Sequence, residues 1–135
     1  MVLEGDLTER ESLRDLHVDT PRVVLNLARV RYINSEGSRR LLQFLDELPA
    51  TDVVAELAPP AVVDLLNLVP ALASKLSVTS VIVPVECPNC LTEGDVRARV
   101  TPGRVPEVDL PTCDECGARM EMAVLPDRYF AFLTA

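Results

Sequence analysis

Four cysteines in the last third of the chain have the spacing of a metal site. Cys87 and Cys90 form one C-x-x-C pair, and Cys113 and Cys116 form a second pair after the intervening residues 91–112. A tight turn presents two sulfurs on the same side, and tetrahedral zinc needs four thiolates about 2.3 Å from one point. The sequence therefore predicts one structural zinc ion per chain, with no open position for water.

Two other uses of paired cysteines are weighed against zinc. A disulfide framework is typical of secreted chains, and the segment Met1–Asp6 has neither the basic start nor the apolar run of a signal peptide. A redox dithiol needs one reactive pair, so the second pair would have no role. The most apolar stretch, residues 57–76, is interrupted by polar residues and prolines and is no membrane span. We expect a cytoplasmic protein without membrane contact.

The residues around the cysteines must position the four sulfurs. Segments 96–100 and 120–124 alternate between apolar and polar residues, which suits the short antiparallel strands of a zinc ribbon. Gly117 follows the second pair and supplies the permissive backbone that such a turn needs. A segment of this size cannot bury a core of its own, so the metal would fold it.

The charge of the chain bears on its partners. The 135 residues hold 13 Lys and Arg against 21 Asp and Glu, a formal net charge of -8. Such a chain has no long-range attraction for a phosphate backbone, so nucleic acid is an unfavoured partner. Zinc ribbons often occur in proteins that bind nucleic acid or the transcription machinery. Binding to these partners is therefore the alternative function. Salt-dependent binding to RNA or DNA would support it.

The residues before Cys87 alternate between helical and strand patterns. Apolar spacing, capping residues and prolines predict helices over 8–17, 35–48, 61–68 and 70–76 and strands over 22–28, 52–57 and 77–83, with a loop over 29–34. Strands that alternate with helices indicate an α/β sandwich whose sheet is at least partly parallel.

The residues Ile33-Asn34-Ser35-Glu36-Gly37 lie between a predicted strand and the start of a predicted helix. Here the chain resembles the STAS domain family, the sulphate transporter and anti-sigma-factor antagonist fold, whose centre is an apolar strand, a short loop and Asp-Ser-Ser/Thr-Gly. The order of elements extends the resemblance over about residues 2–86. The cysteine segment is similar to the ribbon tail of some uncharacterised bacterial STAS-like proteins. The resemblance implies a STAS-like sandwich of a mixed sheet with helices.

The resemblance also implies a function. STAS domains are not enzymes but bind a partner protein, often a switch kinase or a larger signalling assembly. The first serine of their motif, here Ser35, can be phosphorylated to release the partner. This chain departs from the motif at three positions: Asn34 and Asn26 replace aspartates, and Glu36 replaces the second Ser/Thr.

The chemistry of the loop supports two roles for Ser35. A serine at a helix N-terminus caps unpaired N–H groups, and the same N–H groups and helix dipole would favour a phosphate. The loop is also a basic island in an acidic chain, where only Glu36 opposes the arginines. The residues predicted to dock a partner are Asn34, Glu36, Arg29, Arg31, Arg39 and Arg40.

Three other features leave alternatives open. His17, the only histidine, ends a predicted helix, where it either interacts with the helix dipole or acts as a ligand or base. The sequence has no nucleophile elbow around Ser35 and no phosphate-loop motif. Asn67 either bonds a neighbouring backbone group or marks a partner contact. A last helix starting near Asp127 either buries Phe130 and Leu133 against the body or forms an exposed docking peptide.

Together these patterns predict three parts: a STAS-like domain over 1–86, a zinc ribbon over 87–126 and a C-terminal helix over 127–135. The predicted function is non-enzymatic protein–protein interaction in bacterial signalling or in assembly of a cytoplasmic complex. We expect a signalling or scaffold protein as the partner, and a homo-oligomer stays open. An enzyme acting on a small anion at the Ser35 helix start is the least favoured reading.

Overall fold

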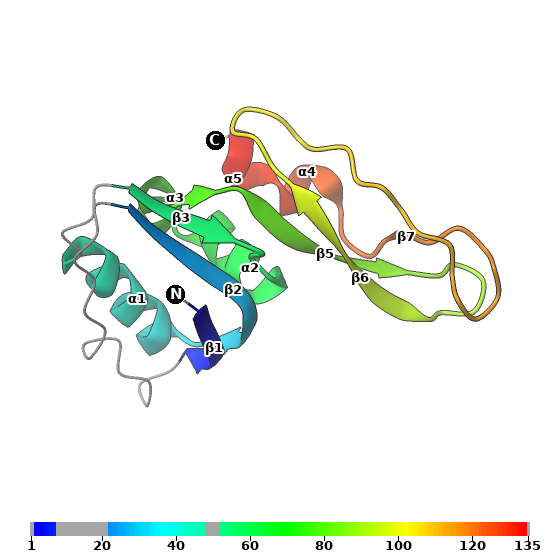
Figure 1. Cartoon of the computed structure of the whole chain (residues 1–135), viewed down its shortest axis with the longest axis horizontal. Coiled ribbons are helices and arrows are strands. Elements are labelled where there is room, and N and C mark those ends of the chain that lie inside the picture. The colour runs from blue at the N-terminus through cyan, green and yellow to red at the C-terminus, as the bar shows by residue number, and fades with distance from the viewer. Residues whose placement is uncertain (1, 8–21, 48–51, 135) are drawn as a thin grey trace.

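The structure is a computed structural model that describes residues 2–7, 22–47 and 52–134. The predicted helix over 8–17 and His17 lie outside the described residues. The described part is a mixed α/β fold with two sheets. In Figure 1 the first sheet and α1 (Ser35–Glu47) lie at one end of the long axis, and the cysteine loops lie at the other.

The first sheet consists of four parallel strands in the order β1-β2-β3-β4. Their bounds are Val2–Leu7 for β1, Arg22–Ile33 for β2, Asp52–Glu56 for β3 and Ser77–Val78 for β4. The parallel pairing confirms the expected, at least partly parallel sheet, whereas β1 was not predicted. The described strands are all parallel, so this is not the mixed sheet that the resemblance implies, because the chain after β4 pairs in the other sheet. Three consecutive residues of β3 are buried, so both faces of the sheet are covered.

Strand β2 continues through the segment 29–34 that was predicted to be a loop, as far as Ile33. The Asn26 side chain accepts a hydrogen bond from the Ala28 N–H at 3.0 Å. At this point the register with β1 shifts by one residue, which is a β-bulge. Beyond the bulge Val30 is buried, while Arg29 and Arg31 are exposed. The loop prediction was wrong because the bulge changes which residues of the strand face the core.

Proline begins most of the described helices. Besides α1, they are α2 (Pro60–Leu68), α3 (Pro70–Lys75), α4 (Pro126–Tyr129) and α5 (Ala131–Thr134). Three of them start with proline, whose fixed φ suits the first helical position. Helices α1 and α2 lie on either side of β2 in Figure 1. No helix in the described ranges has the length and apolar character needed to cross a membrane.

The segment predicted as one strand over 77–83 is divided between two sheets. Strand β4 belongs to the first sheet, and β5 (Ser80–Glu86) is the centre of the second. At Thr79, between them, the N–H donates to the Ala55 carbonyl at 3.0 Å and the carbonyl accepts from Val100 N–H at 3.0 Å. The chain therefore passes from one sheet to the other at a single residue.

The second sheet is antiparallel and has the order β6-β5-β7. Strand β6 spans Glu93–Arg99 and β7 spans Glu121–Met122, so both overlap the strands predicted in this segment. Val81 and Val83 of β5 belong to the same buried cluster as Leu25 of the first sheet. The two sheets therefore share one hydrophobic core rather than having separate ones.

The C-terminal residues complete this shared core. Phe130 is fully buried and Leu133 is 8% exposed, as predicted for a tail that packs against the body. The Tyr129 hydroxyl donates to the Ile82 carbonyl at 2.6 Å, and burial, followed by the charges of two aspartates, raises the pKa of this tyrosine. The tail thus ties the helical layer to β5.

Asn67 of α2 holds the tail through three hydrogen bonds. Its amide nitrogen donates to the carbonyls of Arg128 and Tyr129 at 3.2 and 3.1 Å. Its side-chain oxygen accepts from the Phe132 N–H at 2.9 Å. Of the two predicted roles, the structure shows the bond to backbone groups. These groups lie more than 60 residues away in sequence.

Candidate metal centre

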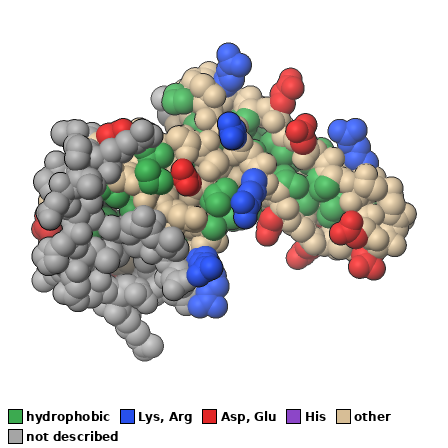
Figure 2. All heavy atoms as spheres, viewed as in Figure 1, with side chains coloured by type: hydrophobic (Ala, Val, Ile, Leu, Met, Phe, Trp, Pro, Cys, Tyr) green, Lys and Arg blue, Asp and Glu red, His purple; other side chains and the backbone are tan. Residues whose placement is uncertain are grey.

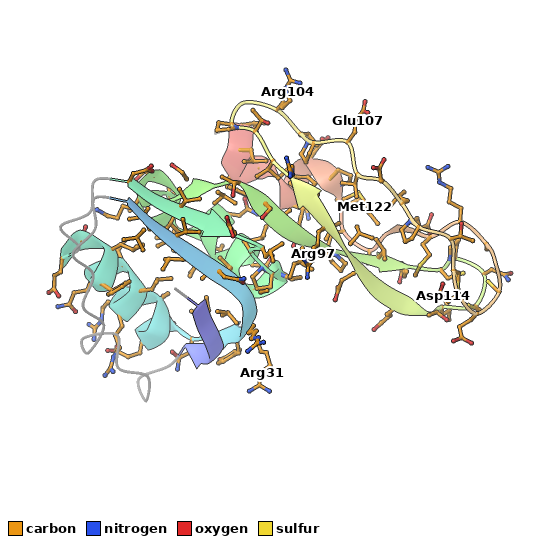
Figure 3. All side chains as sticks on the ribbon, viewed as in Figure 1. Arg31, Arg97, Arg104, Glu107, Asp114 and Met122 are labelled. Carbon is orange, nitrogen blue, oxygen red and sulfur yellow. The ribbon has the colours of Figure 1, made fainter. Side chains whose placement is uncertain are left out.

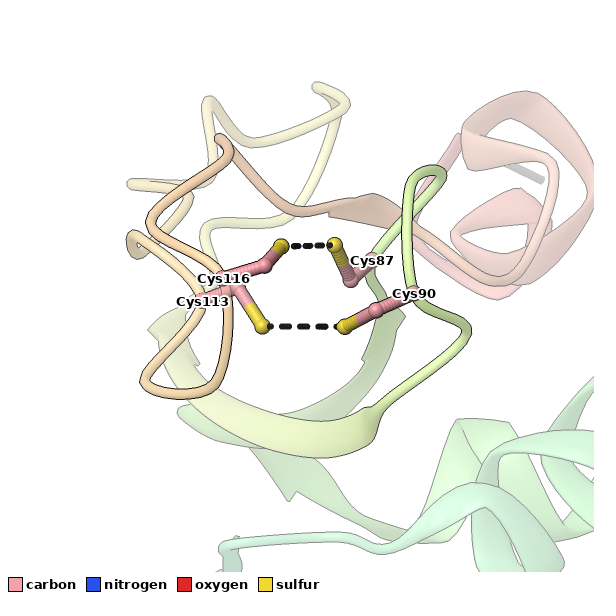
Figure 4. A group of neighbouring side chains, drawn as sticks. All are labelled: Cys87, Cys90, Cys113 and Cys116. Carbon is pink, nitrogen blue, oxygen red and sulfur yellow. Dashed lines mark hydrogen bonds between the residues drawn. The ribbon is translucent and has the colours of Figure 1, made fainter.

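The four cysteine sulfurs come together at the far end of the second sheet (Figure 4). All lie within 4.8 Å of one another. The Cys87–Cys116 sulfur separation is 3.4 Å and the Cys90–Cys113 separation is 3.5 Å. Sulfurs that share a tetrahedral ion at 2.3 Å are about 3.8 Å apart, whereas a disulfide joins sulfurs at about 2.05 Å. The free thiols thus have a spacing compatible with one structural metal ion.

The two cysteine turns have the same backbone hydrogen bonds. In each, the N–H of the first cysteine donates to the carbonyl five residues later, at 2.8 Å for Cys87 and 2.7 Å for Cys113. The carbonyl of that cysteine accepts the N–H four residues later, at 2.9 Å in both turns. The two turns therefore present their sulfurs in the same way.

The fourth residue after each first cysteine has a left-handed backbone. Gly117 has φ 77°, which is the conformation that the sequence predicted for this glycine. The equivalent residue of the first turn is Leu91, with φ 65°. A non-glycine residue in this region carries a cost and persists only where its surroundings hold it. Sequence reasoning missed Leu91, because a leucine gives no signal for a left-handed position.

Burial distinguishes the two cysteines of each pair. Cys87 is fully buried and Cys113 is 3% exposed, and both pack in a small cluster with Val85 and Met120. Cys90 and Cys116, the second of each pair, are exposed. The centre therefore lies at the edge of a small apolar cluster whose buried residues are distinct from those of the main core, with Val96 packed against both.

The surroundings alter the acidity of the thiols. A hydrogen bond from the Thr92 side chain lowers the pKa of Cys90, and one from the Asn89 side chain lowers the pKa of Cys116. The N–H of Cys90 lowers the pKa of Cys87, but burial and the neighbouring sulfurs outweigh it and raise that pKa to about 11. Lowered thiol pKa values favour the thiolates that a metal ion requires.

The second predicted site, around Ser35, lies where β2 meets α1. The Asn34 side chain accepts a hydrogen bond from the Gly37 N–H at 2.8 Å, and its carbonyl accepts from the Ser38 N–H at 2.9 Å. Asn34 is therefore the N-cap of α1. Ser35 is the first helical residue and is exposed, so the prediction that Ser35 itself caps the helix is wrong.

The charged residues of this junction form two groups. Glu36 accepts hydrogen bonds from Arg39 at 2.7 and 2.9 Å and from Arg40 at 3.4 Å. The Arg39 guanidinium lowers the pKa of Glu36, and Glu36 raises the pKa of Arg39. Arg29 and Arg31 are exposed on the last part of β2, with Arg31 labelled in Figure 3. Glu36 thus offsets part of the charge of the predicted basic island.

The cap assignment predicts different effects for two adjacent substitutions. Asn34→Ala removes the acceptor for the Gly37 N–H and should lower the free energy of unfolding by about 1 kcal/mol. Ser35→Ala leaves that hydrogen bond intact and should change the free energy of unfolding by less than about 0.5 kcal/mol. Urea unfolding followed by circular dichroism measures both. A larger loss for Ser35→Ala than for Asn34→Ala would return the capping role to the serine.

No family model matches the chain, and neither does a curated protein or a solved structure. The candidate sites therefore depend on the residues of this chain alone. Across residues 2–7, 22–47 and 52–134, the four cysteines form the one group of three or more His, Cys, Asp or Glu side chains placed to hold a metal ion.

Proposed function

We propose that this chain is a non-enzymatic protein-binding module, with a STAS-like α/β part and a zinc ribbon. A signalling or scaffold protein docks at the start of α1 in this proposal. The observation that carries it is the β2–α1 junction, where exposed Ser35 begins the helix beside the Glu36–Arg39–Arg40 group. This junction combines an accessible helix start with arginines in a chain of net charge -8, which supports an acidic partner surface.

Zinc is the metal that we propose for the cysteine centre. Four thiolates at tetrahedral spacing favour zinc or iron among the metals of proteins. Four sulfur ligands complete the coordination of zinc, so a zinc ion here binds no substrate and has a structural role. The ion joins the turns after β5 and before β7, which also share a small apolar cluster.

Phosphorylation of Ser35 is the regulation that we propose for the docking surface. A phosphate on the first helical residue would lie beside the N–H groups at the start of α1 and the positive end of its dipole. It would also bring two negative charges to a surface that we expect to bind an acidic partner. The intact mass of the chain from its own host, measured across growth states, shows whether the phosphate is added.

The docking proposal is tested by charge reversal on α1. Arg39→Glu combined with Arg40→Glu should abolish capture of the partner from the host, measured by affinity purification with quantitative mass spectrometry, because both guanidiniums would be replaced by acids. The matched control, Arg104→Glu with Arg119→Glu, makes the same charge change at exposed arginines of the cysteine segment. Equal capture by wild type and the α1 variant would remove this surface from the proposal, provided that both variants keep the circular dichroism of wild type.

A further inference from the structure

Strand β6 is the outer strand of the second sheet, and its free edge has no partner strand among the described residues (Figure 1). All of its residues, from Glu93 to Arg99, pair with β5 on the other side. A strand of seven residues with a free edge is a template for another strand. The side chains along this edge decide what kind of strand can pair with it.

The hydrogen bonds to β5 show which backbone groups of β6 point outward. One residue beyond each end of the ladder, the Cys87 N–H donates to the Thr92 carbonyl and the Val100 N–H donates to the Thr79 carbonyl. Hydrogen-bonded pairs alternate along an antiparallel ladder. The groups that face β5 are thus those of Gly94, Val96 and Ala98, and the N–H and C=O groups of the other four residues face the free edge.

These four residues carry all the charges of the strand, in the order acid, acid, base, base. They are Glu93, Asp95, Arg97 and Arg99, and all four side chains are exposed. Opposite them on β5 are Glu86, Pro84, Ile82 and Ser80. Figure 3 labels Arg97 on β6, and Figure 2 shows both acidic and basic side chains over the second sheet.

The charges on β6 therefore find no counter-charge across the ladder. Glu93 instead lies opposite Glu86, a pairing of like charges that is unfavourable. Within the described part of the chain, none of the four charged side chains of β6 takes part in an ion pair. A second strand beside the free edge could supply the missing counter-charges.

The charge order is complementary to itself when the strand is reversed. If two copies of β6 pair antiparallel about Val96, Glu93 lies opposite Arg99 and Asp95 lies opposite Arg97 of the other copy. This register joins residues whose backbone groups both point outward, as an antiparallel ladder requires. Shifting the register by two residues in either direction places Asp95 opposite Asp95 or Arg97 opposite Arg97. The centred register is therefore the one in which every charged residue meets an opposite charge.

We propose that the chain forms a two-fold dimer through its β6 edges, which joins the two second sheets into one continuous antiparallel sheet. The partner at this edge is a second copy of the chain, because the charge pattern is its own complement. The backbone provides the hydrogen bonds, and the four ion pairs select the register. This inference does not depend on the proposed docking function, since it uses a different surface.

Charge-reversal variants test the dimer. Sedimentation equilibrium of the full metal-loaded chain should show a reversible dimer for wild type. Arg97→Glu with Arg99→Glu makes the edge wholly acidic, and Glu93→Arg with Asp95→Arg makes it wholly basic. Each variant alone should dimerise at least about tenfold more weakly, because four attractions become repulsions. Circular dichroism and metal content, unchanged in each variant, would exclude misfolding.

Mixing the variants tests the pairing itself. An equimolar mixture of the acidic and basic variants should form a heterodimer, and the chain with all four substitutions should recover the wild-type dimer. A wild-type chain that is still monomeric at about 1 mM would overturn the proposal. So would a dimer that both variants leave unchanged, or two monomeric variants that fail to associate when mixed.

Discussion

Replacement of Cys87 by serine is expected to abolish metal binding and to unfold the far end of the second sheet. Cys87 is fully buried, and its sulfur lies 3.4 Å from that of Cys116. Serine offers a poor ligand in place of the thiolate. Structural zinc contributes about 10–16 kcal/mol of apparent binding free energy in zinc-finger peptides, so this loss should exceed the effect of any single core substitution.

The unfolding should be local, because the second sheet contributes different buried residues to the small cluster and to the main core. Val85 and the cysteines belong to the small cluster, whereas Val81 and Val83 belong to the main core. Hydrogen exchange should therefore rise over 85–95 and 110–122. It should stay low in the first part of β5 and at Ala98 and Val100, which belong to the main core. Elemental analysis by mass spectrometry measures the metal, with one zinc per chain expected for wild type.

Thr92→Val is the matched control for this experiment. It removes the hydroxyl that lies 3.1 Å from the Cys90 sulfur while leaving all four ligands in place. We expect it to retain one zinc per chain. A Cys87→Ser chain that keeps a full equivalent of metal and unchanged exchange would exclude this cysteine as a ligand. Iron in place of zinc in wild type would contradict the proposed metal but not the site.

Phe130→Ala is expected to lower the free energy of unfolding by about 3–5 kcal/mol. Phe130 is fully buried, and its ring meets that of Tyr129 edge-on with centroids 5.3 Å apart. Truncation leaves a cavity where α4 and α5 join the main core. The effect is large because the chain has only five aromatic residues, three Phe and two Tyr, and this one fills space shared by both sheets.

Urea unfolding with circular dichroism measures this loss, and Leu125→Ala serves as its control. Leu125 is 64% exposed just before α4, so its truncation should change the free energy of unfolding by less than about 0.5 kcal/mol. Because both sheets share the core around Phe130, we expect the loss to appear in one cooperative transition. A cost below about 1 kcal/mol for Phe130→Ala would show that the tail contributes little to the folded state.

Local patterns in the sequence predicted the four cysteines of the candidate metal centre. Two C-x-x-C pairs impose two tight turns, and Gly117 has the positive φ that its position predicted. The parallel strands β2 and β3, the prolines that begin three helices and the burial of Phe130 and Leu133 were likewise predictable. Each depends on residues that are close in sequence, or on apolar side chains that have no stable place except in a core.

The tertiary structure alone decided features that depend on distant residues. The passage between sheets at Thr79 requires bonds from Ala55 and Val100, and Asn67 finds its acceptors in the C-terminal tail. The choice of Asn34 rather than Ser35 as the cap depends on where β2 ends. Because the strand pairing continues to Ile33, Asn34 is the residue between the strand and the first helical residue, Ser35. The free edge of β6 follows from strand order, which is fixed by hydrogen bonds between segments that no local pattern specifies.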